Sequence, residues 1–307
     1  MLTTNADQPF QPATMLCAAD FSELSNLALK YAAAGALAYG ARLVVLHASH
    51  FEPPRYFTPG QIEALQAQVH AAAGALEATL RQHVQAVLGE LAARLNISFR
   101  IVTGHAVDGV LATAAEEKAG LIVMGTHGRG GGRRLWLGSV AENVVRQAEV
   151  PVAVVRQKQH EFIDAARPES PLRLQTILCP VNATPVARMA LRVAASIAGA
   201  FQARLISACA IEPGARPAGL SSANTEAWVR DLTGNACAVD FRERHGRAAE
   251  EIVALAQEAK ADLIVLGAQR QPSLGSWLWG DTTELVLRHA PVPVLVVPRT
   301  GVADGAL

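Results

Sequence analysis

Short apolar runs alternate with longer segments of helical periodicity along the whole chain. Runs of four to six apolar residues between glycine, proline or polar residues predict buried strands of a parallel sheet, and apolar positions at every third or fourth residue predict helices. In the first half the predicted strands are residues 15–19, 43–47, 97–102, 121–124 and 152–155. Strands that alternate with helices imply an α/β fold with right-handed crossover connections.

The predicted helices have recognisable ends. Gly40 is expected to end the first helix, because glycine readily adopts the left-handed conformation of a helix C-terminus. The segment from Gln61 to about Leu95, rich in Ala, Leu and Gln, is predicted to be helical with an interruption near Gly89. A third helix is predicted from Val107 to Lys118, closed by Gly120.

The same order of elements occurs twice. Residues 177–182 repeat the first strand at an offset of 162, with Asn182 in the place of Asp20, and residues 263–267 repeat the fourth strand, 121–125, at an offset of 142. The first copy therefore carries 20 additional residues between its second strand and its last helices. Such a repeat indicates two homologous domains, predicted at 1–158 and 173–307 with a polar linker at 159–172.

The amino-acid composition argues against some classes of binding partner. The 27 basic and 27 acidic residues balance, so no overall basic field attracts nucleic acid or an acidic membrane. Neither a signal peptide nor an apolar run of spanning length is apparent, so we expect a cytoplasmic protein. The four cysteines form no CxxC pair and are expected to be buried thiols; metal ligands and a disulfide are the alternatives.

The segment from Gly125 to Ser139, GTHGRGGGRRLWLGS, lies between a predicted strand and a predicted helix. Glycines there allow backbone amides to approach a phosphate, and the helix N-terminus favours an anion. Ser139 and Glu142 have the spacing of a capping box, a role that is compatible with phosphate contact. His127 has no acid partner nearby in sequence, and the P-loop, GxGxxG, GxSxG and HExxH patterns are absent, so no catalytic residue is predicted.

The glycine spacing resembles that of a known family. Gly125, Gly128, Gly138 and Ser139 follow the pattern Gly, two residues, Gly, nine residues, Gly, Ser, which is similar to the ATP-binding branch of the universal stress proteins. The resemblance covers nearly the whole chain, as a tandem of two domains. It implies Rossmann-like domains of the adenine nucleotide alpha hydrolase-like type, each with a five-stranded parallel sheet in the order 3-2-1-4-5, whose fifth strands pair antiparallel.

The resemblance also implies a site for ATP, with magnesium accompanying the phosphates. Asp20 would meet the ribose or adenine, Ala48 the adenine, and the glycine loop the phosphates. The residues that it assigns to the nucleotide are Ala19, Asp20, Ala48, Met124, Gly125, Gly128, Arg129, Gly138, Ser139 and Val140. Arg133 and Arg134 are further candidates for the phosphate contact.

The second copy departs from this pattern at three positions. Asn182 replaces the acid, Arg270 the second glycine and Asp281 the serine, which places a carboxylate where a phosphate would lie. We therefore expect nucleotide in the first domain only, and a stress-response or regulatory nucleotide sensor as the function. A nucleotide-independent interaction scaffold and a slow ATPase are the alternatives, and a homodimer of the tandem chain stays open.

Overall fold

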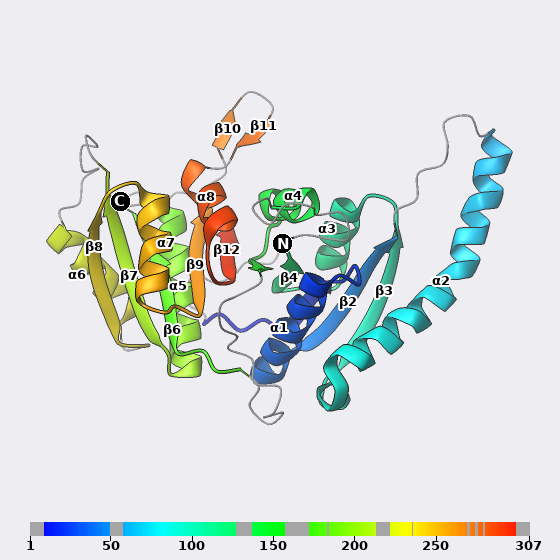
Figure 1. Cartoon of the computed structure of the whole chain (residues 1–307), viewed down its shortest axis with the longest axis horizontal. Coiled ribbons are helices and arrows are strands. Elements are labelled where there is room, and N and C mark those ends of the chain that lie inside the picture. The colour runs from blue at the N-terminus through cyan, green and yellow to red at the C-terminus, as the bar shows by residue number, and fades with distance from the viewer. Residues whose placement is uncertain are drawn as a thin grey trace.

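The computed structural model describes residues 9–49, 58–126, 137–156, 172–182, 184–212, 222–234, 236–268, 271–273, 276–278 and 280–298. Ten strands form one continuous sheet to which both halves of the chain contribute, with helices on both faces (Figure 1). The α/β class expected from the alternation of apolar runs and amphipathic segments is confirmed.

The first half contributes five parallel strands in the order β3-β2-β1-β4-β5. The strands are β1 (Thr14–Ala18), β2 (Arg42–Ser49), β3 (Ile97–Thr103), β4 (Leu121–Gly125) and β5 (Val152–Val155). The helices are α1 (Glu23–Tyr39), α2 (Pro59–Leu88), the 3-10 helix η1 (Gly89–Arg94), α3 (Ala106–Glu116) and α4 (Ser139–Gln147).

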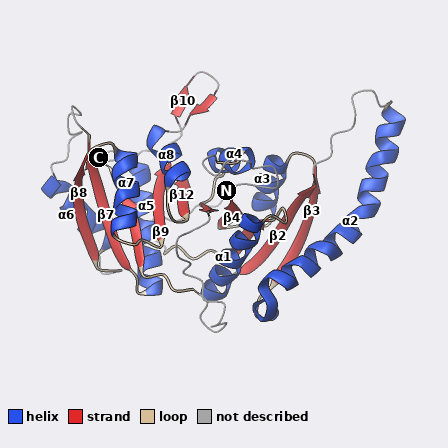
Figure 2. Ribbon diagram, in the orientation of Figure 1, coloured by secondary structure: helices blue, strands red, loops and turns tan. Residues whose placement is uncertain are grey.

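The second half repeats this arrangement in the order β12-β9-β6-β7-β8. Its strands are β6 (Thr176–Pro180), β7 (Arg204–Ile211), β8 (Val239–His245), β9 (Leu263–Ala268) and β12 (Val294–Pro298), and its helices are α5 (Pro185–Phe201), α6 (Ser222–Thr233), α7 (Ala248–Glu258) and α8 (Asp281–His289). A small hairpin, β10 (Gln271–Ser273) and β11 (Ser276–Leu278), precedes α8 (Figure 2).

The two halves meet at their fifth strands. β5 and β12 pair antiparallel, with Val152 opposite Val296 and Val154 opposite Val294. The expected pairing is confirmed, and so is the order 3-2-1-4-5 within each half. The two predicted five-stranded sheets are joined, however, into a single ten-stranded sheet, because this pairing satisfies the backbone groups of both inner edges.

Two apolar layers cover the two faces of the sheet. Successive strand residues point to opposite faces, so Met15 and Cys17 belong to the layer under α1, α2, α5 and α6, and Leu16 belongs to the layer under α3, α4, α7 and α8. Cys17 is fully buried, and burial raises its pKa to about 12. All four cysteines are free thiols. Cys17 and Cys179 are buried, as expected, and therefore protonated and unreactive, whereas Cys209 and Cys237 are only partly buried.

The observed helix ends agree in part with those predicted from the sequence. Gly40 ends α1 with φ of 62°, and Gly89, with φ of 55°, is the first residue of η1, directly after the end of α2. The third helix begins one residue earlier and ends two residues earlier than predicted: it ends at Glu116, and Lys118 rather than Gly120 takes the left-handed conformation, with φ of 50°. The additional residues of the first copy lie mainly in α2, which has 30 residues against 12 in α6 and extends beyond the sheet in Figure 1.

Candidate functional site

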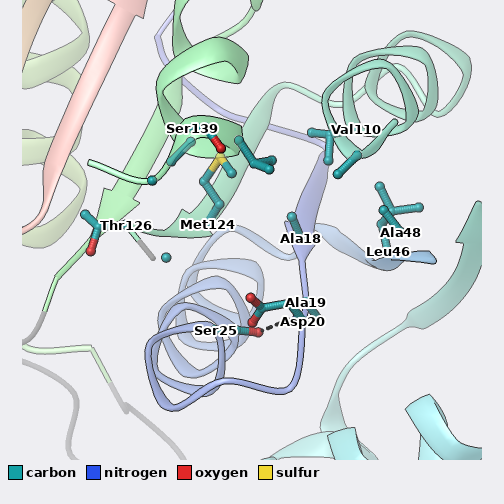
Figure 3. A pocket seen from close by; sticks show the side chains of 15 residues that line it. Ala18, Ala19, Asp20, Ser25, Leu46, Ala48, Val110, Met124, Thr126 and Ser139 are labelled. Atoms are coloured by element: carbon teal, nitrogen blue, oxygen red, sulfur yellow. Dashed lines mark hydrogen bonds between the residues drawn. The ribbon is translucent and has the colours of Figure 1, made fainter. Parts of the chain in front are cut away.

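A cavity of about 460 Å³ opens at the carboxyl ends of β1, β2 and β4. β1 lies between β2 and β4, and the connections that the chain makes from β1 to β2 and from β3 to β4 lead to opposite sides of β1. Open α/β sheets bind ligands at such a switch point. The wall includes side chains from α3 and the first turn of α4 (Figure 3). Its volume lies in the range of small-molecule and cofactor sites.

The structure brings eight of the ten predicted site residues together in this wall: Ala19, Asp20, Ala48, Met124, Gly125, Gly138, Ser139 and Val140. Gly128 and Arg129 lie outside the described residues, as do Arg133 and Arg134. The sequence reasoning missed Ala18, Ser25, Leu46, Ala106, Val110, Thr126 and Ala141. Alternation along β2 could have identified Leu46 from Ala48, because residues two apart point to the same face.

Asp20 lies in the turn between β1 and α1. Its Oδ1 accepts hydrogen bonds from the backbone N of Ser22 at 3.0 Å and from Ser22 Oγ at 2.6 Å, while its own backbone N donates to Ser25 Oγ at 3.0 Å. Ser22 is the N-cap of α1. Oδ2 of Asp20 has no partner among the described residues, so one carboxylate oxygen holds the turn and the other is available to a ligand.

Neighbouring residues fix the backbone that carries Asp20. The backbone N of Ala19 donates to the carbonyl of Leu46 at 2.8 Å, and the carbonyl of Ala19 is 2.7 Å from His47 Nδ1. Phe21 has φ of 64°, and its ring packs against His47 and His83 with centroid distances of 4.8 and 4.9 Å. A left-handed conformation is strained for a bulky residue, so these ring contacts stabilise the turn.

The first turn of α4 forms the opposite wall. Its N-cap is Gly138, and Ser139 is the first helical residue, so the predicted capping box of Ser139 and Glu142 is wrong. Glu142 instead forms an ion pair with Arg146 at 2.5 Å. The amides of the first turn of a helix have no acceptor within the helix, and they form an anion site where they line a cavity. Ser139, Val140 and Ala141 all line it.

Gly125 is required for packing. A Cβ atom at this position would lie 3.0 Å from the backbone carbon of Leu24 and 3.1 Å from its carbonyl oxygen. In the second half, a Cβ at Gly267 would lie 2.7 Å from the carbonyl oxygen of Val186. Because both halves show the same close approach of helix to strand, this glycine by itself does not distinguish a site that binds a ligand.

The equivalent region of the second half carries different chemistry. Asn182 Oδ1 accepts a hydrogen bond from Thr184 Oγ1 at 2.6 Å, which reproduces the turn of Asp20 without its charge. Asp281 is the first residue of α8, where Gly280 is the N-cap, and no side chain caps this helix. Glu212 Oε1 accepts a hydrogen bond from the backbone N of Ala248, the first residue of α7, at 3.0 Å. Two carboxylates thus lie at the helix N-termini of this half.

The described residues contain no group of three or more His, Cys, Asp or Glu side chains arranged to hold a metal ion. None of the helices among them combines the length and the apolar character that a membrane crossing requires.

The chain is similar to universal stress proteins over both halves. The model of the universal stress protein family matches residues 13–156 and 173–298. The universal stress protein in the QAH/OAS sulfhydrylase 3' region of Thermus aquaticus is 36% identical over 143 residues, which cover 47% of this chain and 98% of that protein.

Solved structures share the fold over nearly the whole chain. A universal stress protein from Archaeoglobus fulgidus has a TM-score of 0.66 at 21% identity and covers 95% of this chain and 98% of its own. A functionally unknown protein from Pseudomonas aeruginosa has a TM-score of 0.63 at 18% identity, covering 95% and 94%. With both halves matched by the family model, this chain belongs to the universal stress protein family and carries two of its domains in tandem.

Proposed function

We propose that the first domain binds ATP in the cavity at the carboxyl ends of β1, β2 and β4, and that the protein is a nucleotide-dependent regulator of the stress response. The observation that carries the proposal is the pairing, across one cavity, of a carboxylate oxygen without a partner on Asp20 with the first-turn amides of α4. A carboxylate suits hydroxyl and amino donors of a nucleoside, and helix amides suit phosphate.

The apolar part of the wall supports an adenine ring. Leu46, Ala48 and Val110 lie on the side of the cavity away from α4 (Figure 3). A nucleotide would therefore extend from this apolar side, past Asp20, to the N-terminus of α4. Magnesium would enter bound to the phosphates, since it is commonly held by phosphate oxygens and water with few protein ligands.

The second domain is proposed to bind no nucleotide. Asp281 at the N-terminus of α8 would lie close to any phosphate there, and Glu212 already occupies the N-terminus of α7. The Asp281 carboxylate and a phosphate are both negatively charged, and two such charges in close contact repel by up to a few kcal/mol in a partly buried site. Asn182 in addition lacks the charge of Asp20. The nucleotide state would then be sensed by one half of the chain and transmitted through the shared sheet.

Calorimetric titration of the full chain with ATP and magnesium tests this proposal. One site per chain is expected; two sites would refute the restriction to the first domain, and no binding would refute nucleotide binding and favour the scaffold. Release of ADP over hours, measured in the same samples, would favour the slow ATPase.

Exchanging the two residues that open the α4 and α8 helices gives a matched pair of variants. Ser139→Asp gives the first domain the acid of the second, and Asp281→Ser makes the converse change. An acid at a helix N-terminus favours the helix, so Ser139→Asp should fold normally and lose ATP binding. Asp281→Ser should retain one site. Unchanged ATP affinity in Ser139→Asp would contradict the phosphate position.

A further inference from the structure

Ser25 is a buried serine in the first turn of α1, and it lines the cavity beside Asp20. Only 3% of its surface is exposed. Its Oγ accepts a hydrogen bond from the backbone N of Asp20 at 3.0 Å, and its backbone N donates to Ser22 Oγ at 3.2 Å. The side chains of Ser25 and Asp20 lie next to each other at one side of the cavity (Figure 3).

The hydroxyl hydrogen of Ser25 is left for a ligand. A serine hydroxyl has one hydrogen to donate in addition to the lone pairs that accept. The amide of Asp20 uses a lone pair of Ser25 Oγ, and the hydroxyl donates to no acceptor among the described residues. A buried donor without an acceptor costs free energy, which a ligand acceptor in the cavity would recover.

The second half shows that the fold does not require this hydroxyl. Ala187 stands at the position equivalent to Ser25, at the offset of 162. The backbone N of Ala187 donates to Thr184 Oγ1 at 3.3 Å, so α5 begins with the same capped turn as α1. Because an alanine suffices for the turn and the helix, the hydroxyl of Ser25 is best explained by a role in the cavity.

We propose that Ser25 and Asp20 together recognise the two adjacent hydroxyl groups of a ribose, so that the first domain selects ribonucleotides over deoxyribonucleotides. One ribose hydroxyl donates to Asp20 Oδ2, and the other accepts from Ser25 Oγ. An ionised carboxylate only accepts, whereas each hydroxyl of a diol can donate or accept, so the pair of side chains fits a diol. A phosphate oxygen beside Asp20 would be repelled by its charge. The inference rests on the proposed nucleotide binding and adds the residue that contacts the second hydroxyl.

Calorimetric titrations of the full chain with ATP, 2′-deoxy-ATP and 3′-deoxy-ATP separate the two contacts. The wild type should bind each deoxy nucleotide at least about fivefold more weakly than ATP, as expected for one net hydrogen bond. Ser25→Ala should weaken ATP about fivefold and should then bind ATP and one of the two deoxy nucleotides equally. Asp20→Asn should reduce the preference for the other hydroxyl and leave the first preference unchanged.

The equivalent position of the second half supplies a matched control. Ala187→Ser makes the converse change there and should alter neither the ATP Kd nor the number of sites. Ser25→Ala is expected to fold, because Ala187 already begins the equivalent helix turn. Thermal unfolding of both variants checks this.

Three results would overturn the recognition of a diol while leaving nucleotide binding intact. The first is equal binding of all three nucleotides by the wild type. The second is an ATP Kd, or a preference for both hydroxyls, that survives unchanged in Ser25→Ala. The third is loss of both preferences together in Ser25→Ala, because the serine would then act only by holding the backbone of Asp20. Absence of ATP binding by the wild type would instead refute the nucleotide site itself, and this inference with it.

Discussion

Changing Asp20 to Asn gives the first domain the residue that the second domain has at the same position. The turn should persist, because Asn182 Oδ1 already accepts a hydrogen bond from Thr184 Oγ1 at 2.6 Å, as Asp20 Oδ1 does from Ser22 Oγ at 2.6 Å. The change therefore removes the charge from the oxygen that faces the ligand and leaves the local fold intact. Asp20→Ala, by contrast, would also remove the bond to Ser22.

The expected loss of ATP affinity follows from the strength of charge-assisted hydrogen bonds. A hydrogen bond to a carboxylate is about twice as strong as one to a neutral acceptor, so Asp20→Asn should cost about 1 to 2 kcal/mol of binding free energy, or about 5- to 30-fold in Kd. Calorimetry with ATP and with 2′,3′-dideoxy-ATP forms a cycle: the wild type should lose affinity for the dideoxy nucleotide, and the variant should lose less. An unchanged ATP Kd in a variant with an unchanged melting temperature would refute the role of Asp20.

Three further changes test the packing and electrostatics of the fold. Gly267→Ala places a methyl group about 2.7 Å from the carbonyl oxygen of Val186, so urea denaturation should show a loss of about 1 to 3 kcal/mol with ATP affinity unchanged. A hydrogen bond from Arg42 holds the pKa of Glu117 below its usual range, so the ionised carboxylate stabilises the folded chain at neutral pH. This stabilisation should disappear as the pH falls through the lowered pKa. The free energy of unfolding of Glu117→Gln should therefore be below that of the wild type at pH 7 and converge with it in acid. Arg156 Nη1 donates to a backbone carbonyl of the last turn of α8 at 2.5 Å, so Arg156→Met should weaken the junction between the halves by about 1 to 2 kcal/mol, measured by thermal unfolding.

The strands were predictable because buried parallel strands read as continuous apolar runs, and the repeat supplied a second copy of each run. Their order followed from the resemblance to the universal stress proteins. Helix ends were less predictable. Lys118 and Lys260 both adopt φ of 50°, although neither is a residue that signals a left-handed conformation. Tertiary contacts decide such positions. The sequence therefore predicted that α3 continues to Lys118 before the nearby Gly120, two residues beyond its actual end at Glu116.

The site residues were predictable where they belong to a motif that can be recognised in the sequence. Asp20 and the segment from Gly138 to Val140 were identified through the resemblance to the universal stress proteins that the glycine spacing carries, and they line one cavity. The capping residue of α4 was wrong by one position, because glycine and serine are both common N-caps and stand side by side here. Val110 was missed because α3 follows β3 and packs beside the cavity only in the folded sheet, and no sequence pattern near Val110 indicates this contact.

The two copies of the fold distinguish residues that the architecture requires from residues that ligand binding requires. Gly125 and Gly267 both allow a helix to approach a strand, so this glycine follows from packing whether or not a nucleotide binds. The turn after the first strand is likewise made in both halves, once with a carboxylate and once with an amide. Because the neutral side chain suffices for the turn, the negative charge of Asp20 has no structural role there that Asn182 does not fulfil. The charge is then best explained by a ligand whose donors face the cavity, and this is why Asp20→Asn is the sharpest test of the proposed site.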